Sequence, residues 1–238
     1  MTGFIAYLPF GSCLISFVFA AAILRRYLAK GGAHLLLWAV GMVFFSIGSF
    51  AEAYYVTAGW QPLMFRLWYL FGAVLVAAWL GQGTVYLLAR RRWANVSTAL
   101  LLAASVFATY RVFGTELDPS RMVASLQAGA ELSGQAIIDS SVRALTPIFN
   151  IYGTVMLVGG AAWSAWIFWR KRIMPHRVIG NVLIAAGAIL PALGGTMSRF
   201  GIPGTLYITE FLGAILLFIG FLRAITPMTT KDGPASRG

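Results

Sequence analysis

The sequence predicts an all-α membrane protein, a bundle of seven transmembrane helices. Of the 238 residues, 59% are hydrophobic and only 11% are charged, whereas a soluble domain carries about 25% charged residues. The apolar residues form seven long runs, and the charged residues lie in short clusters between them. The mean hydropathy is +0.80. These observations exclude an ordinary soluble enzyme or nucleic-acid-binding domain, although the net charge is +11.

Each apolar run is long enough to cross a bilayer, because a hydrocarbon core of ~30 Å needs about 20 helical residues. Backbone groups find no water in that core, so such runs must be helices. The alternating segments of ~10 residues that form membrane β-barrels do not occur in the sequence. The predicted spans are Phe4 to Tyr27, His34 to Val56, Leu63 to Leu88, Ala94 to Phe113, Leu145 to Trp169, Val178 to Phe200 and Leu206 to Ile225.

Basic residues follow the first, third and seventh runs and separate the fifth from the sixth, which predicts that these loops are cytoplasmic. The N-terminus is then outside and the C-terminus inside. Residues 1–225 form the predicted transmembrane domain, with an outer loop at 114–143, and 226–238 form a short cytoplasmic tail that is expected to be disordered. Six of the seven acids fall on the outer side, namely Glu52, Glu116, Asp118, Glu131, Asp139 and Glu210. Tryptophans are expected at both interfaces, with Trp38, Trp93, Trp166 and Trp169 inside and Trp60 and Trp68 outside.

The outer loop contains a signal for a short helix. Asp118 precedes Pro119 and Ser120, a sequence that suits a helix cap followed by Pro at the first helical position. Met122, Val123 and Leu126 would then lie on the membrane surface or over the mouth of the bundle. An ordered surface loop and a lid remain alternative interpretations.

The first and last three runs resemble each other. Gly41 and Gly48 recur as Gly180 and Gly187, and Pro62 with Gly72 matches Pro203 with Gly213. This echo predicts a parallel repeat in which the first three helices correspond to the last three and the fourth links them, as in some transporters. Chance similarity between apolar sequences is the alternative.

Three ionisable side chains interrupt the outer halves of apolar runs: Glu52, Arg66 and Glu210. At ~1.5 Å per helical residue they lie at similar depth, and charges inside membrane spans usually face the bundle interior and mark function. The sequence therefore predicts an outward-facing polar pocket that binds a ligand. Its other expected residues are Tyr55, Tyr69, Tyr207, Asn150 and Arg199. The alternative is structural, a Glu52–Arg66 or Glu210–Arg199 pair that locks helices together.

Several chemistries are not expected, and no cofactor or metal is predicted. The three lysines, Lys30, Lys171 and Lys231, lie outside the spans, so a retinal Schiff base has no attachment point. With two histidines and one cysteine, the usual zinc site is not expected. A haem between His34 and His176 is a minor alternative. No Ser/His/Asp arrangement or phosphate-binding loop is evident, so the chain is not predicted to be an enzyme.

The second and third runs carry a resemblance to a known family. The stretches W-A-V-G-M-V-F-F-S-I-G-S-F-A-E-A from Trp38 and F-R-L-W-Y-L-F-G-A from Phe65 are similar to the seven-helix sensor regions at the N-terminus of some bacterial histidine kinases. The resemblance implies a sensor of the bacterial plasma membrane. After Ile225 only residues 226–238 remain, so no kinase domain is expected and no catalytic residue can be transferred.

The sequence thus favours a stand-alone seven-helix sensor or ligand-binding module, receptor-like in topology. A small-solute or proton-coupled transporter with a three-plus-one-plus-three architecture is the second hypothesis, although Gln82, Thr84 and Asn181 are the only evident polar groups in the inner half. A non-catalytic subunit of a larger membrane complex is the third. The expected partners are the lipid bilayer, a protein at the cytoplasmic face and an unidentified small molecule, and not nucleic acid.

Overall fold

The computed structural model describes residues 3–127, 131–200 and 202–226, and these are almost entirely helical. Seven helical segments are long and apolar enough to cross a membrane, which confirms the prediction of an all-α integral membrane protein. The third segment combines three consecutive helical elements of different winding. The long elements are α1 (Leu8–Lys30), α2 (Ala33–Ala58), α3 (Pro62–Leu67), η2 (Trp68–Leu75), α4 (Val76–Leu88), α5 (Arg91–Gly114), α8 (Leu145–Arg170), α9 (Pro175–Arg199) and α10 (Thr205–Ile225). The short elements are η1 (Phe4–Tyr7), α6 (Pro119–Gln127), η3 (Gly134–Ala136) and α7 (Ser140–Arg143).

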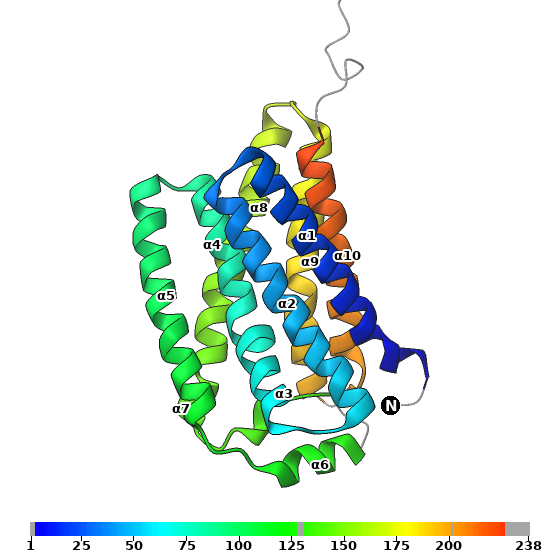
Figure 1. Cartoon of the computed structure of the whole chain (residues 1–238). Helices are drawn as coiled ribbons and strands as arrows, with labels where there is room; N and C mark the ends of the chain where they lie inside the picture. Colours follow the sequence, from blue (N-terminus) through cyan, green and yellow to red (C-terminus); the bar gives the residue numbers. More distant parts are fainter. Residues whose placement is uncertain (1–2, 128–130, 201, 227–238) are drawn as a thin grey trace, which may run out of the picture.

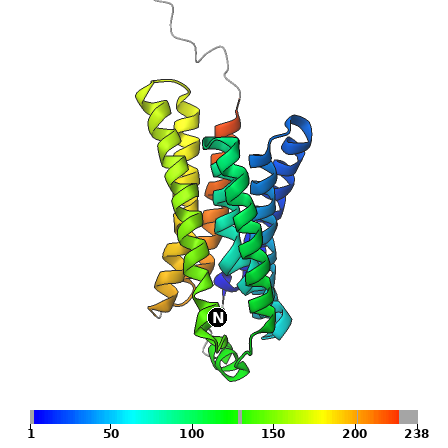
Figure 2. The ribbon, with the colours of Figure 1, turned by 90° about the vertical axis from the view of Figure 1, so that its left-hand side faces the viewer.

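Six of the seven spans form a closed ring. Around the ring, α1 packs on α2, α2 on η2 and α4, α4 on α8, α8 on α9, α9 on α10, and α10 on α1. The fourth span, α5, lies outside this ring and packs mainly against α4 and η2, as its place at the edge of the bundle shows (Figures 1 and 2). The ring interior is therefore built by the first three and the last three spans.

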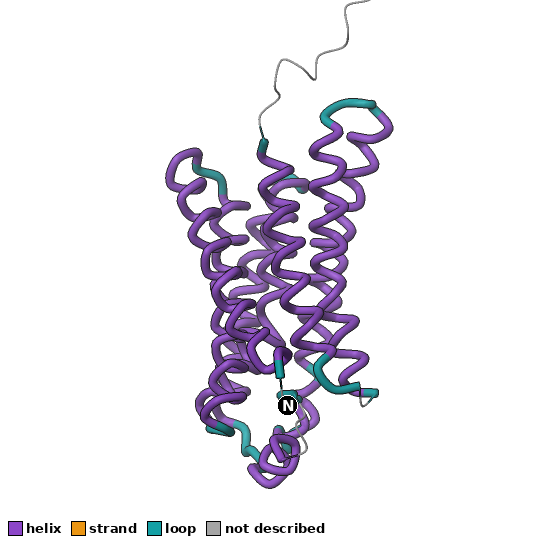
Figure 3. Tube along the Cα trace, turned by 90° about the vertical axis from the view of Figure 1, so that its right-hand side faces the viewer, coloured by secondary structure: helices purple, strands orange, loops and turns teal. Residues whose placement is uncertain are grey.

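The loops gather at the two ends of the bundle (Figure 3). The basic loops that follow α1, α4 and α8 share the end where α10 finishes, at the top of Figure 1. We call this the basic end. The six acids named above belong to the opposite, acidic end, which also holds α6. The separation of charge between the ends is as the sequence predicted, whereas the side that faces the cytoplasm stays a prediction.

Glycines allow two pairs of ring helices to approach closely. A Cβ at Gly48 would lie 2.7 Å from the Cα of Gly72, and one at Gly187 would lie 2.8 Å from the carbonyl oxygen of Gly213. Small residues at helix crossings let backbones approach where the lipid supplies no hydrophobic driving force for association. Close contacts of α2 with η2 and of α9 with α10 therefore depend on glycine at these positions.

The middle of the third span is wound as a π-helix over η2. Such wide turns are rare and leave backbone groups without regular helical partners. The Nδ2 of Asn150 on α8 donates to the carbonyl oxygen of Ala73 in η2 at 2.8 Å. The predicted site residue Asn150 thus stabilises the irregular helix.

The outer loop packs against the acidic end of the bundle. Its helix α6 begins at Pro119, as predicted, and Asp118 Oδ1 accepts the backbone N–H of Ser120 at 3.1 Å. Met122 is fully buried in the same apolar cluster as Tyr69 of η2, whereas Val123 is exposed. The side chain of Leu126 lies outside the described part of the structure. The loop therefore covers the bundle end at Met122, as expected of the lid interpretation.

The peripheral helix α5 is tied to the bundle by a buried glutamine. Gln82 of α4 is fully buried, and its Nε2 donates to Ser97 Oγ and Thr98 Oγ1 of α5, at 2.8 Å each. Its Oε1 accepts the hydroxyl of Tyr152 on α8. Gln82 thus joins three helices. This structural role explains why a polar side chain lies inside the bundle, and it does not require that Gln82 takes part in transport.

Candidate functional site

The central residue of the candidate site is Glu52, two turns from the acidic end of α2. Only 1% of its surface is exposed. Its Oε1 accepts a hydrogen bond of 2.8 Å from the indole Nε1 of Trp68, on the first turn of η2. Its Oε2 has no hydrogen-bond partner in the described part of the structure. Trp68 was expected at the membrane interface, but it is buried inside the bundle because its N–H serves this carboxyl group.

Glu210 on α10 provides the second carboxyl group. It interacts electrostatically with Glu52, so the two acids face each other on the inner side of the ring. A carboxylate only accepts hydrogen bonds, and a contact between two carboxyl groups is therefore stable when they share a proton. Like charges this close in a site of low dielectric cannot both be ionised. The pair is suited to bind and release a proton.

Tyr207 lies one turn before Glu210 on the same face of α10. It is fully buried, and its hydroxyl has no hydrogen-bond partner among the described groups. The hydroxyl interacts electrostatically with Glu52, Glu210, Glu131 and Tyr55. The predicted residues Glu52, Glu210, Tyr55 and Tyr207 are therefore brought together by the fold, and we call them, with Trp68 and Glu131, the carboxyl cluster.

Glu131, like Trp68, is a member that the sequence did not indicate as a site residue. It belongs to the outer loop but is only 4% exposed. Its Oε1 accepts the backbone N–H groups of Leu206 at 2.9 Å and Tyr207 at 3.4 Å, at the start of α10. A carboxylate satisfies free N–H groups and opposes the helix dipole at this position. Burial nevertheless raises the pKa of Glu131, although the hydrogen bonds from Ser198 and from backbone N–H groups oppose that shift.

Arg66 does not pair with Glu52. Its guanidinium donates to the carbonyl oxygens of Val112 and of Thr115, the latter at 2.8 Å, at the end of α5. Arginine there satisfies carbonyl groups that a helix end leaves without partners. The expected Glu52–Arg66 lock is therefore not formed, and Arg66 anchors α5. The side chain of Arg199, the other expected partner, lies outside the described residues.

Tyr69 forms a contact between helices. Thr146 Oγ1 on α8 donates to its hydroxyl at 2.8 Å. With the Asn150 bond to Ala73, this contact fixes α8 against η2. Of the eight predicted site residues, Tyr69, Asn150 and Arg66 thus hold neighbouring helices in place. Sequence alone does not separate them from the residues of the carboxyl cluster, because the difference depends on the direction of each side chain.

The predicted outward opening is not found at the carboxyl cluster. Glu52, Tyr207 and Glu131 are each at most 4% exposed. Leu132 and Ile137 of the outer loop are also buried, in the apolar cluster that includes Trp68. Buried loop residues therefore accompany the buried carboxyl groups of Glu52 and Glu131 at the acidic end.

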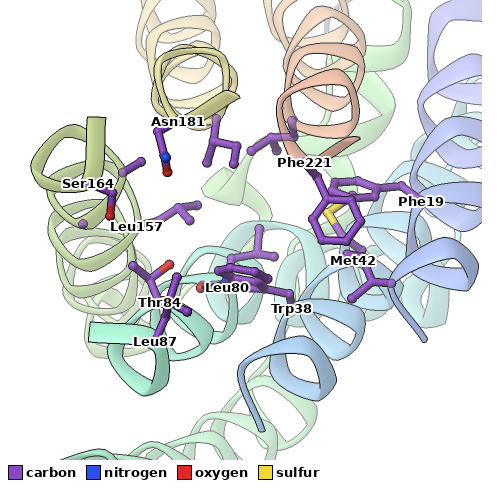
Figure 4. A pocket seen from close by; sticks show the side chains of 15 residues that line it. Phe19, Trp38, Met42, Leu80, Thr84, Leu87, Leu157, Ser164, Asn181 and Phe221 are labelled. Atoms are coloured by element: carbon purple, nitrogen blue, oxygen red, sulfur yellow. Dashed lines mark hydrogen bonds between the residues drawn. The ribbon is translucent and has the colours of Figure 1, made fainter. Parts of the chain in front are cut away.

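A pocket occurs instead inside the ring near the basic end (Figure 4). It spans about 530 Å³, including its open side. All six ring spans contribute to its wall, which is mostly aliphatic and aromatic. The lining residues are Phe19, Ile23, Trp38, Met42, Leu80, Thr84, Leu87, Leu157, Gly160, Ala161, Ser164, Asn181, Ile184, Leu217 and Phe221.

Trp38, which is predicted to lie at the inner interface, contributes to the pocket wall. Its Nε1 donates to the carbonyl oxygen of Leu80 at 3.0 Å, which turns the indole inward. Two of the polar residues noted in the sequence, Thr84 and Asn181, also line the pocket. The pocket itself could not be inferred from the sequence, because it arises where six separate helices fail to fill the ring.

No group of three or more His, Cys, Asp or Glu side chains suited to a metal ion occurs among the residues that the structure describes. His34 lies with its ring 5.4 Å from that of Trp38, edge to face. Comparisons of the chain with protein-family models, curated proteins and solved structures give no match.

Proposed function

We propose that this protein is a proton-coupled transporter of a small solute, in which Glu52 and Glu210 together carry the proton. The observation that carries the proposal is the electrostatic interaction of the fully buried Glu52 with the half-buried Glu210 inside the ring. Neither acid forms an ion pair with a described basic side chain; the described ion pairs are Arg111–Asp139 and Arg121–Asp118. Acids inside transmembrane bundles commonly serve as proton relays.

The arrangement of the ring supports this proposal. A covered acidic end and a pocket near the basic end are what a carrier needs in one of two alternating states. The glycine pairs Gly48–Gly72 and Gly187–Gly213 occupy matching positions in the sequence echo and make matching helix contacts. We therefore infer a three-plus-one-plus-three repeat with α5 as the linker, and a basic end that faces the cytoplasm, where Lys- and Arg-rich loops are retained.

Infrared difference spectroscopy across a pH titration tests the carboxyl pair directly. The wild-type protein should show the carbonyl stretch of a protonated buried carboxyl group at neutral pH, because two facing carboxylates are unfavourable. Both Glu52→Gln and Glu210→Gln should lose that band, and Glu116→Gln, an exposed acid at the same end, should keep it. A wild-type protein without the band would contradict the proposal.

Transport is tested in proteoliposomes that contain an internal pH dye. Addition of a transported solute should change the internal pH of wild-type and Glu116→Gln vesicles and leave Glu52→Gln and Glu210→Gln vesicles unchanged. An equal response in all four proteins would exclude the carboxyl pair as the proton carrier.

A receptor is the second candidate, and one contact favours it. Glu131 of the outer loop binds the first N–H groups of α10, one turn from Glu210. A ligand that displaced the loop would therefore act on α10 and on the carboxyl pair together. This hypothesis predicts ligand-dependent exposure of the loop to protease without any movement of protons across the membrane.

A further inference from the structure

The pocket near the basic end has an apolar wall on one side. Phe19 and Phe221 from α1 and α10 lie with ring centroids 5.3 Å apart, and Trp38 meets Phe221 edge to face at 6.5 Å. Met42 and Leu80 close the same side (Figure 4). Ligand pockets are lined predominantly by such hydrophobic and aromatic side chains. The wall selects a hydrocarbon or aromatic body.

Polar side chains occupy the opposite side of the pocket. Thr84, Ser164 and Asn181, from α4, α8 and α9, lie together there (Figure 4). The Nδ2 of Asn181 donates to the carbonyl oxygen of Arg177 at 2.8 Å. Thr84 is only 5% exposed, and its Oγ1 has no hydrogen-bond partner among the described residues. A buried hydroxyl without a partner is unfavourable unless a bound group satisfies it.

The surroundings of the pocket are strongly basic. Arg26 acts electrostatically on His34, whose ring contacts Trp38 of the pocket wall. Arg177 lies one turn before Asn181, and its Nε is buried without a hydrogen-bond partner in the described structure. Every described acid lies at the other end of the bundle. The positive charge near the pocket therefore has no described carboxylate to balance it, which favours an anion.

We propose that this pocket binds an amphipathic organic anion. Its apolar body lies against Phe19, Trp38 and Phe221, and an oxygen of its head group accepts the hydroxyl proton of Thr84. Its negative charge faces Arg26 and Arg177. The role of this anion as substrate depends on the proposed transport function, whereas its binding does not.

Calorimetric titration of the full chain in a neutral detergent tests the class of ligand. The probes are octanoate, octanol and octylammonium, which share one apolar chain, and inorganic phosphate, which lacks it. Octanoate should bind at least tenfold more tightly than octanol, and octylammonium and phosphate should not bind measurably. Equal binding of octanoate and octanol would overturn the proposal, as would tighter binding of octylammonium.

The bound amphipathic anion can be a free solute or a lipid, and a further pair of probes distinguishes these two sources. Octyl phosphate represents the solute and dioctanoyl phosphatidic acid the lipid. Tighter binding of either one supports an amphipathic anion and identifies its source. Failure of both, together with failure of octanoate, would overturn the inference.

Variants locate the binding in the pocket. Ser164→Phe, which fills the polar side, should abolish octanoate binding, while Ala162→Phe on the exposed face of the same helix should leave it unchanged. Thr84→Val keeps the shape of the side chain and should weaken binding about threefold to tenfold. Arg26→Gln with Arg177→Gln should weaken binding of octanoate but not of octanol. Unchanged octanoate affinity in folded Thr84→Val and in the arginine double variant would place the ligand elsewhere.

The outcomes for this inference and for the transporter proposal are separable. Octanoate binding without any proton movement would leave the site intact and exclude coupled transport. Carboxyl-dependent proton movement without binding of any amphipathic anion would exclude the ligand class alone.

Discussion

The two ends of the ring treat polar groups in opposite ways. At the acidic end, the carboxyl groups of Glu52 and Glu131 are buried, and Leu132 and Ile137 of the outer loop are buried beside them. At the basic end, the charges stay on exposed loops, and the ring interior is apolar but incompletely filled. Burial of a carboxyl group requires surrounding structure, because an uncovered group would be hydrated. Where no charge is buried, space can remain for a ligand.

The largest expected difference in stability is between alanine substitutions at two glycines, Gly48 and Gly160. A Cβ at Gly48 meets the backbone of Gly72 at 2.7 Å, whereas one at Gly160 meets Cγ2 of Thr84, a side chain that borders the pocket and can rotate. Gly48→Ala should therefore destabilise the protein by about 3 kcal/mol, the upper range for overpacking. Gly160→Ala should cost less, because only side chains must shift to relieve its contact of 2.3 Å with Thr84. Chemical unfolding in detergent measures both.

The control for this comparison is Gly159→Ala, since a Cβ there has no neighbour within 4 Å. It reports only the higher helix propensity of alanine, worth up to about 1 kcal/mol. If Gly48→Ala were as stable as Gly159→Ala, the close packing of the acidic end would be refuted.

Removal of the indole donor should have the next largest effect. Trp68→Phe leaves Oε1 of Glu52 buried without its hydrogen bond of 2.8 Å, at a cost of about 2 kcal/mol. Trp163→Phe, at a position that is 55% exposed, is the matched control and should change stability little. The same unfolding measurement applies, and similar stabilities of the two variants would argue that the Trp68 bond contributes nothing.

The third prediction concerns pH and the cover over the acids. Because burial raises the pKa of Glu131 above its ordinary value of 4.5, its protonated form is favoured in the folded protein. The stability that protonation adds is complete below pH 4.5 and is lost as the pH rises through the raised pKa of the folded state. Glu131→Gln should remove this loss and make the outer loop more resistant to protease near neutral pH.

The measurement is limited proteolysis of the loop and the unfolding midpoint over a pH series that begins below 4.5. The difference between wild type and Glu131→Gln isolates the contribution of this residue from those of other acids. Parallel pH profiles for the two proteins would show that Glu131 does not titrate as its burial requires.

The smallest effect is expected at an exposed ion pair of the acidic end. Arg111 and Asp139 meet at 2.7 Å, but their side chains are 30% and 44% exposed. Solvent and salt screen such pairs, so Asp139→Asn should shift the thermal midpoint only slightly, and less at high salt. An effect as large as that of Trp68→Phe would contradict the distinction between buried and exposed carboxyl groups.

Much of the candidate site was predictable from residue types and depth. Glu52 and Glu210 are acids in apolar runs, and acids there usually turn inward, so their meeting follows from composition and spacing. Arg66 satisfies the same rule but points to the carbonyl groups at the end of α5. Glu131 gave no such signal, because a loop residue becomes buried only through the path of the chain.

The sequence by itself determined that the chain forms seven helices long and apolar enough to cross a membrane, and that the acids lie at the end opposite the basic loops. These properties depend on the local length and polarity of each run, which the bilayer tests one helix at a time. The tertiary structure alone decided which helices form the ring, that α5 lies outside it, that the third span widens at η2, and that a pocket opens near the basic end. These features depend on contacts between residues far apart in the chain, such as Asn150 of α8 with Ala73 of η2, which local composition does not specify.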